Sequence, residues 1–165
     1  NFFVLFLTSL IPLGLALVWY HPKVFGGQLA SPLLAIAMGG EQKMKPWRLI
    51  SILFLNFFLA FGVFNFTVHQ AHLIGMSGGN FELLKSGVGL QFCEQLGTAH
   101  LSFGHGILHG LFPGVAFIVL PILGTLAYTH NIKRKAFLIH LGFWSISIGL
   151  MGGILNQWGG TPIWQ

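Results

Sequence analysis

The histidines are the residues of this sequence with the clearest capacity for chemistry. There are eight of them in 165 residues, against three carboxylates. His105 and His109 are four residues apart and share one face of a helix, and His69 and His72 are neighbours if a helix extends that far. Imidazole is a ligand for zinc, copper, iron and nickel. The two pairs therefore indicate a metal site, with His72 or His100 as a further ligand.

The two histidine pairs are predicted to lie at similar depths in the membrane. At a rise of ~1.5 Å per residue, His69 lies ~33 Å beyond Trp47 and His109 lies ~28 Å before Tyr128. If Trp47 and Tyr128 mark one membrane boundary, both pairs reach the other. A variant of the metal site is a haem with axial histidines from two facing helices. The alternative is that these histidines cap helix ends, hydrogen-bond between helices or lie among lipid headgroups.

The elements that position these histidines must lie in a membrane. Hydrophobic residues make up 54% of the chain and charged residues 7%, against about a quarter charged in an average soluble domain. Crossing ~30 Å of hydrocarbon takes ~20 helical residues. Four segments qualify, at residues 2–20, 47–68, 109–128 and 137–158. The sequence thus predicts an all-α integral membrane protein, a single domain over residues 1–165 built as a bundle of four transmembrane helices.

Cap and breaker residues predict shorter features around these spans. A Ser-Pro pair predicts an interfacial helix over residues 32–38 in the first loop. In the second loop, Asn80 predicts the N-cap of another, running through about Gln95. Pro113 and Pro121 remove backbone donors from span three, so that span is expected to bend.

Glycines four residues apart mark helix faces that allow close backbone approach. In lipid no hydrophobic force pulls helices together, so small residues dominate helix contacts. Such faces serve either oligomerisation or packing within the monomer's own bundle. The predicted packing positions around spans three and four are Gly106, Gly110, Gly114, Gly149 and Gly153.

The distribution of Lys and Arg predicts the orientation. Loops one and three share a side of a four-span protein, and that side holds seven of the eight cations, whereas loop two contributes only Lys85. Basic residues favour the cytoplasmic side. Both termini and loop two are therefore predicted to be periplasmic. Because the cations abut apolar runs, they do not indicate nucleic-acid binding.

Established catalytic signatures are absent from the sequence. There is no Walker loop, no G-x-S-x-G elbow, no H-E-x-x-H and no C-x-x-C. None of the predicted spans holds an acidic residue that could couple transport to an ion. The sequence therefore favours a protein that is not an enzyme.

The chain contains Trp19-Tyr20-x-Pro22 and His105-Gly106-x-x-His109-Gly110. With several other short stretches, these resemble a known family, the domain-of-unknown-function 1761 family of small four-span bacterial membrane proteins. The resemblance covers nearly the whole chain and implies a bacterial inner-membrane protein without supplying an activity, substrate or cofactor. After Phe25-Gly26 the chain departs from the family, which tends to continue with Trp and Lys. The other stretches that carry the resemblance include Gly142-Phe143-Trp144 and the run from Leu150 to Leu155.

Two hypotheses of function follow. The first is a structural or accessory protein that contacts the lipid bilayer and packs as a homo-oligomer or as a subunit of a larger inner-membrane assembly. It rests on the glycine faces and the missing catalytic groups. The alternative is a membrane protein that binds a transition metal or haem through the histidines at the periplasmic boundary.

The orientation is tested by fusing a phosphatase that is active only in the periplasm. A fusion after Gln165 should give phosphatase activity, and a fusion near Lys133 should not, because the basic turn is retained in the cytoplasm. The reverse pattern would move the histidine pairs to the cytoplasmic side.

Overall fold

The computed structural model describes residues 1–26, 46–96 and 99–160, and this part of the chain contains helices and no strand. The elements are α1 (Phe2–Ser9), α2 (Ile11–Trp19), α4 (Pro46–Thr67), α5 (His69–Met76), α6 (Phe81–Leu84), α7 (Gly87–Leu96), α8 (Phe103–Pro113), the π-helix η2 (Gly114–Val119), α9 (Leu120–Thr129), α10 (Arg134–Ile154) and the π-helix η3 (Leu155–Gly159). The predicted helix over residues 32–38 lies outside the described residues.

Among the described residues, four helical stretches are long and apolar enough to cross a membrane, so the predicted all-α fold with four helices of this kind is confirmed. They cover Phe2–Trp19, Leu49–Thr67, Phe103–Thr129 and Arg134–Gly159. The third begins six residues before the predicted residue 109. Its earlier start follows from the Ser102 side chain, which accepts a hydrogen bond from the backbone N–H of His105 at 3.3 Å and caps the helix.

The third span also changes its helical register, between the two prolines that were expected to bend it. Pro113 ends α8, and the π-helix η2 follows it directly. Pro121 lies in the first turn of α9, where its missing N–H costs least. A π-helix widens the hydrogen-bonded ring, so it accommodates backbone groups that the prolines leave unmatched.

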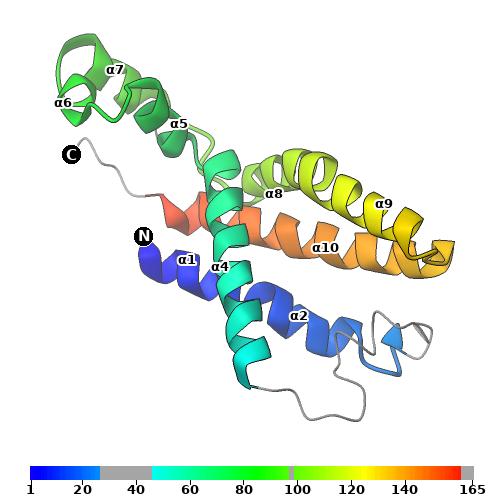
Figure 1. The fold of residues 1–165 in the computed structure, drawn as a ribbon. Helices are drawn as coiled ribbons and strands as arrows, with labels where there is room; N and C mark the ends of the chain where they lie inside the picture. The colour runs from blue at the N-terminus through cyan, green and yellow to red at the C-terminus, as the bar shows by residue number, and fades with distance from the viewer. Residues whose placement is uncertain (27–45, 97–98, 161–165) are drawn as a thin grey trace.

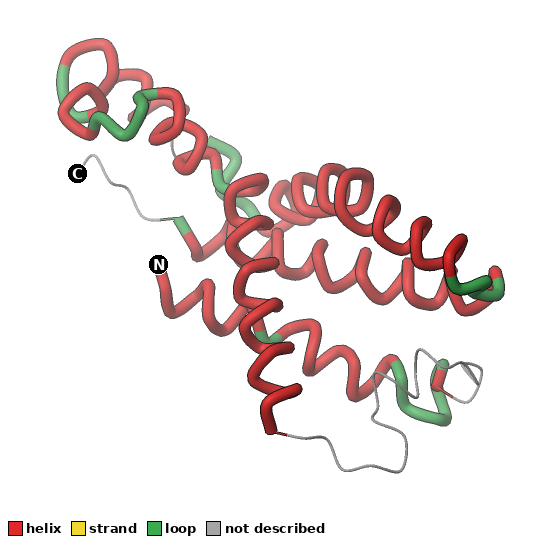
Figure 2. Tube along the Cα trace, in the orientation of Figure 1, coloured by secondary structure: helices red, strands yellow, loops and turns green. Residues whose placement is uncertain are grey.

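The helices form a bundle around α10 (Figures 1 and 2). The stretch from α8 to α9 returns along α10 as an antiparallel hairpin, α2 lies against the first half of α10, and α4 crosses the bundle. The backbone N of Asn1 donates to the carbonyl of Gly159 at 2.9 Å, which places the start of α1 beside η3. The main core lies where these helices meet and includes Ala60, Val63, Ile148 and Met151.

The second loop forms three short helices that project beyond the bundle (Figure 1). Asn80 caps α6 as predicted, accepting from the N–H of Leu83 at 3.2 Å. The prediction that one helix runs from Asn80 through about Gln95 is wrong, because α6 ends at Leu84 and α7 begins at Gly87. Gly87 has a φ of +56°, a conformation that interrupts a right-handed helix and suits glycine.

Helices α8 and α10 approach each other backbone to backbone. A Cβ atom on Gly106 would collide with the carbonyl oxygen of Gly152, and one on Gly110 would lie 2.8 Å from the carbonyl oxygen of Ile148. A Cβ on Gly152 would likewise meet Gly106, and it would lie 3.1 Å from the Cγ2 atom of Thr67 on α4. Three helices therefore meet at Gly152.

The other predicted packing glycines contact side chains of the same chain. A Cβ on Gly114 would lie 2.6 Å from Ile148, one on Gly149 would lie 3.2 Å from Leu111, and one on Gly153 would lie 2.7 Å from Phe103.

Replacing Gly106 by Ala should lower the stability of the bundle. The added methyl group forces α8 away from α10, and overpacking of this kind costs about 1–3 kcal/mol. Gly104 is the matched control on the same helix, because a Cβ there meets no atom within 4 Å; Gly104→Ala should hold or raise stability by up to about 1 kcal/mol. Unfolding in detergent, followed by circular dichroism, measures both. Equal stability of the two variants would contradict the packing at Gly152.

Candidate metal centre

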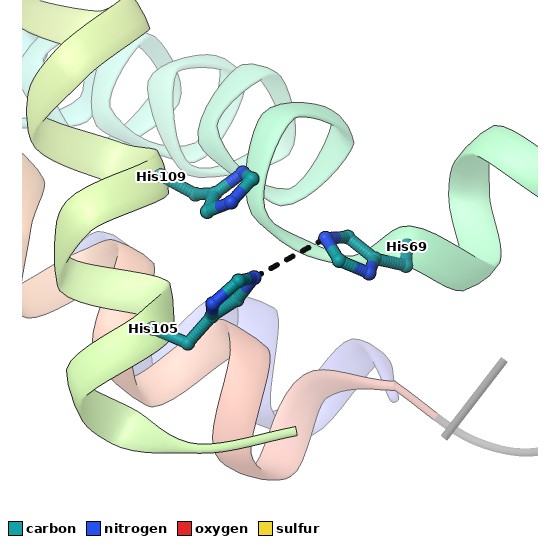
Figure 3. Close-up of side chains that lie close together, drawn as sticks. All are labelled: His69, His105 and His109. Carbon is teal, nitrogen blue, oxygen red and sulfur yellow. Dashed lines mark hydrogen bonds between the residues drawn. The ribbon is translucent and has the colours of Figure 1, made fainter. Parts of the chain in front are cut away.

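A break between α4 and α5 positions His69. Helix α4 ends at Thr67, and Val68 is extended, with φ −98° and ψ 107°. His69 is then the first residue of α5. Val68 is fully buried, so the break is held by packing at the end of the bundle. The chain leaves α4 in a new direction, and His69 lies opposite α8 (Figure 3).

Polar side chains of η3, which directly follows α10, hold the beginning of α8. The Asn156 side-chain amide is 1% exposed and donates to the carbonyls of His100 and Ser102 at 2.8 and 2.9 Å. The Oε1 atom of Gln157 accepts from the backbone N–H of Phe103 at 2.9 Å. These bonds fix the first turn of α8, and with it the face that carries His105.

Three imidazoles from two helices converge beside this turn. The Nε2 atoms of His69 and His105 are 3.3 Å apart, and one nitrogen from each of His69, His105 and His109 lies within 4.8 Å of the other two. All three side chains are half-buried. Figure 3 shows His105 and His109 extending from α8 toward His69.

The other two predicted ligands lie next to this group without joining it. The His100 ring stacks on His105 with a centroid distance of 4.9 Å, and the His72 ring lies 6.1 Å from that of His69. Both side chains are exposed. Among the described residues, the convergent group of possible metal ligands therefore consists of His69, His105 and His109.

The environment of His69 favours its neutral form. Burial lowers the pKa of His69, and the neighbouring imidazoles, His105 first, lower it further. His69 and His105 also both lie in the first turn of their helices, where the helix dipole disfavours a cation. Neutral imidazole is the form that binds metal ions.

The spacing of these nitrogens suits a small metal ion. A tetrahedral zinc ion with Zn–N distances of about 2.0–2.1 Å holds its ligand nitrogens about 3.3–3.4 Å apart. The distance of 3.3 Å between the Nε2 atoms of His69 and His105 matches this value. With His109 as the third ligand, a tetrahedral ion would keep a fourth position for water.

A haem fits the same arrangement less well. Two axial imidazoles bind haem iron from opposite faces of a wide macrocycle, which needs a slot between them. The ligand nitrogen of His109 lies within 4.8 Å of those of both His69 and His105. It would stand where the macrocycle has to pass, so the geometry favours a single ion.

Sequence reasoning did not single out the residues that position the group. Ser102, Asn156 and Gln157 act through the backbone of residues 100–105. Two signals were available in the sequence. Ser102 precedes the histidine-bearing segment as an N-cap residue does, and Asn156 is a polar side chain within an apolar span, where such groups usually bind a neighbouring helix.

Comparison with known proteins yields one family. A family model described as "Protein of unknown function (DUF1761)" matches residues 3–156. No curated protein and no solved structure matches the chain.

Proposed function

The chain belongs to the DUF1761 family, and we propose that it is a membrane protein that binds one transition-metal ion through His69, His105 and His109. The observation that carries this proposal is the convergence of three imidazoles from two helices, with two Nε2 atoms 3.3 Å apart. An all-imidazole ligand set suits zinc, copper, iron or nickel, and disfavours magnesium and calcium, which prefer oxygen ligands.

Without a metal ion, the proximity of the three imidazoles is harder to explain. Neighbouring histidines repel one another when protonated, and this repulsion adds to burial in lowering the pKa of His69. A hydrogen bond between His69 and His105 would account for one of the contacts and would leave His109 without a role. A metal ion accounts for all three, because it replaces mutual repulsion by a shared ligand bond.

The site lies at the end of the bundle opposite the basic turn. Its histidines lie at the start of α5 and in the first half of α8, whereas Lys133 directly precedes α10 and Arg134 and Lys135 begin it. The excess of Lys and Arg on that side supports a cytoplasmic position for the turn. The metal site would then face the periplasm of a bacterium whose inner membrane holds the protein.

A role as an accessory subunit or oligomer has less support. The hypothesis rested on the missing catalytic groups and on glycine faces that could serve either oligomerisation or packing within the monomer. In the structure Gly106, Gly110, Gly114, Gly149 and Gly153 all lie against the chain's own helices. Binding to partner subunits therefore stays a prediction, and this packing gives no reason to expect it.

Protein purified without an affinity tag should bind about one zinc ion per chain in equilibrium dialysis with elemental analysis. His105→Ala and His109→Ala, alone or combined, should weaken binding by more than about 100-fold, because even residues behind a ligand contribute 10- to 100-fold. His130→Ala is the matched control, since His130 is exposed and lies at the other end of the bundle.

Two results would decide against the proposal. Zinc that binds equally to the double variant and to the control would come from other groups. Absence of stoichiometric binding of zinc, copper, nickel and iron to the folded protein would leave the histidines with hydrogen bonding between helices alone.

A further inference from the structure

Two exposed histidines flank the convergent group of His69, His105 and His109. Between ring centroids, His100 lies 4.9 Å from His105 and 6.0 Å from His69, and His72 lies 6.1 Å from His69. The three side chains of the convergent group are half-buried, whereas those of the two flanking histidines are exposed. The five imidazoles therefore form a continuous set that runs from the half-buried group to the exposed surface.

The ring spacings match the distance over which one metal ion can hold two imidazoles. With Zn–N distances of about 2.0–2.1 Å and tetrahedral angles, two imidazole centroids on one zinc ion lie about 5 Å apart. The rings of His100 and His105 are 4.9 Å apart, so one ion can bind both. The spacing of 6.1 Å between His69 and His72 is longer by about 1 Å, which a change of rotamer in an exposed side chain can close.

The backbone at His100 is held in a conformation that favours glycine. Its φ is +63°, and the other positive φ values among the described residues belong to three glycines and to Asn131. The carbonyl of His100 accepts from the backbone N–H of Ser102 and from the Asn156 side chain, both at 2.8 Å. Strained residues of this kind cluster at functional sites. Here the strained residue adds an imidazole beside His105.

The open position of the proposed metal ion allows the flanking imidazoles to take part. Structural zinc sites are closed by four protein ligands, whereas an ion with three protein ligands has room for an incoming one, and zinc can pass through five-coordination. Each step of such an exchange forms one metal–nitrogen bond and breaks one metal–water or metal–nitrogen bond. The oxidation state of the ion does not change, so no redox partner is needed.

We propose that His72 and His100 are transfer ligands, which bind the metal ion transiently as it enters and leaves the convergent group. This inference rests on the proposed function and adds to it what the site does with its ion. The ion is an exchangeable cargo, taken up from and released to other metal-binding molecules at the exposed surface. It is not a permanent structural ion.

The test measures zinc exchange in the protein purified in detergent. Release is followed by mixing the zinc-loaded protein with an excess of a chelating dye, and uptake by mixing the metal-free protein with the zinc-loaded dye. His72→Ala is combined with His100→Asn, because asparagine tolerates a positive φ. His130→Ala is the control, since it removes an exposed imidazole at the other end of the bundle.

The double variant should release and take up zinc about tenfold more slowly, because a ligand that binds only during passage lowers the barrier in both directions. Its Kd, measured by equilibrium dialysis, should stay within about twofold of the wild-type value for the same reason. The retained Kd also shows that the variant is folded. The control should keep both rates and the Kd.

Three outcomes would overturn the inference. Wild-type rates in the double variant would remove the transfer role and leave the proposed metal site intact. Faster release with a raised Kd and unchanged uptake would make His72 and His100 ordinary ligands of the bound ion. Absence of stoichiometric zinc binding in the wild-type protein would overturn the proposed function and this inference with it.

Discussion

The close contact between the backbones of α8 and α10 is the constraint on which the rest of the structure depends. It requires glycine at Gly106 and Gly152, because a Cβ on either one would collide with the other's carbonyl oxygen. Thr67, the last residue of α4, lies against the same point. Since His69 follows two residues later and His105 precedes Gly106, this packing point brings the imidazoles of two helices together.

Side-chain hydrogen bonds then fix the position of α8 along α10. Asn156 lies four residues beyond Gly152, one turn further along α10 and η3, and reaches the segment that leads into α8. A hydrogen bond in an apolar surrounding is costly to leave unmade, so these bonds hold α8 at one height against α10. This fixes the position of His105 and His109 relative to His69, whereas the side chains of His72 and His100 are exposed.

Much of the fold and part of the site could be predicted from the sequence. Apolar runs identified four spans, because lipid permits little besides helices of that length, and counting helical rise brought His69 and His109 to one level. The break at Val68 could not be predicted, since neither Pro nor Gly marks it and only tertiary packing holds an extended valine there. For the same reason, spacing alone could not separate His69 from His72 as the inward-facing residue.

X-ray absorption spectroscopy of the zinc-loaded protein tests the central claim most directly, because it reads the ligands of the bound ion. The account predicts a first shell at about 2.0–2.1 Å with the multiple-scattering pattern of three imidazoles, reduced to one in a His105→Ala, His109→Ala variant loaded at high zinc. A shell of oxygen atoms without imidazole scattering, or a pattern unchanged in that variant, would contradict it.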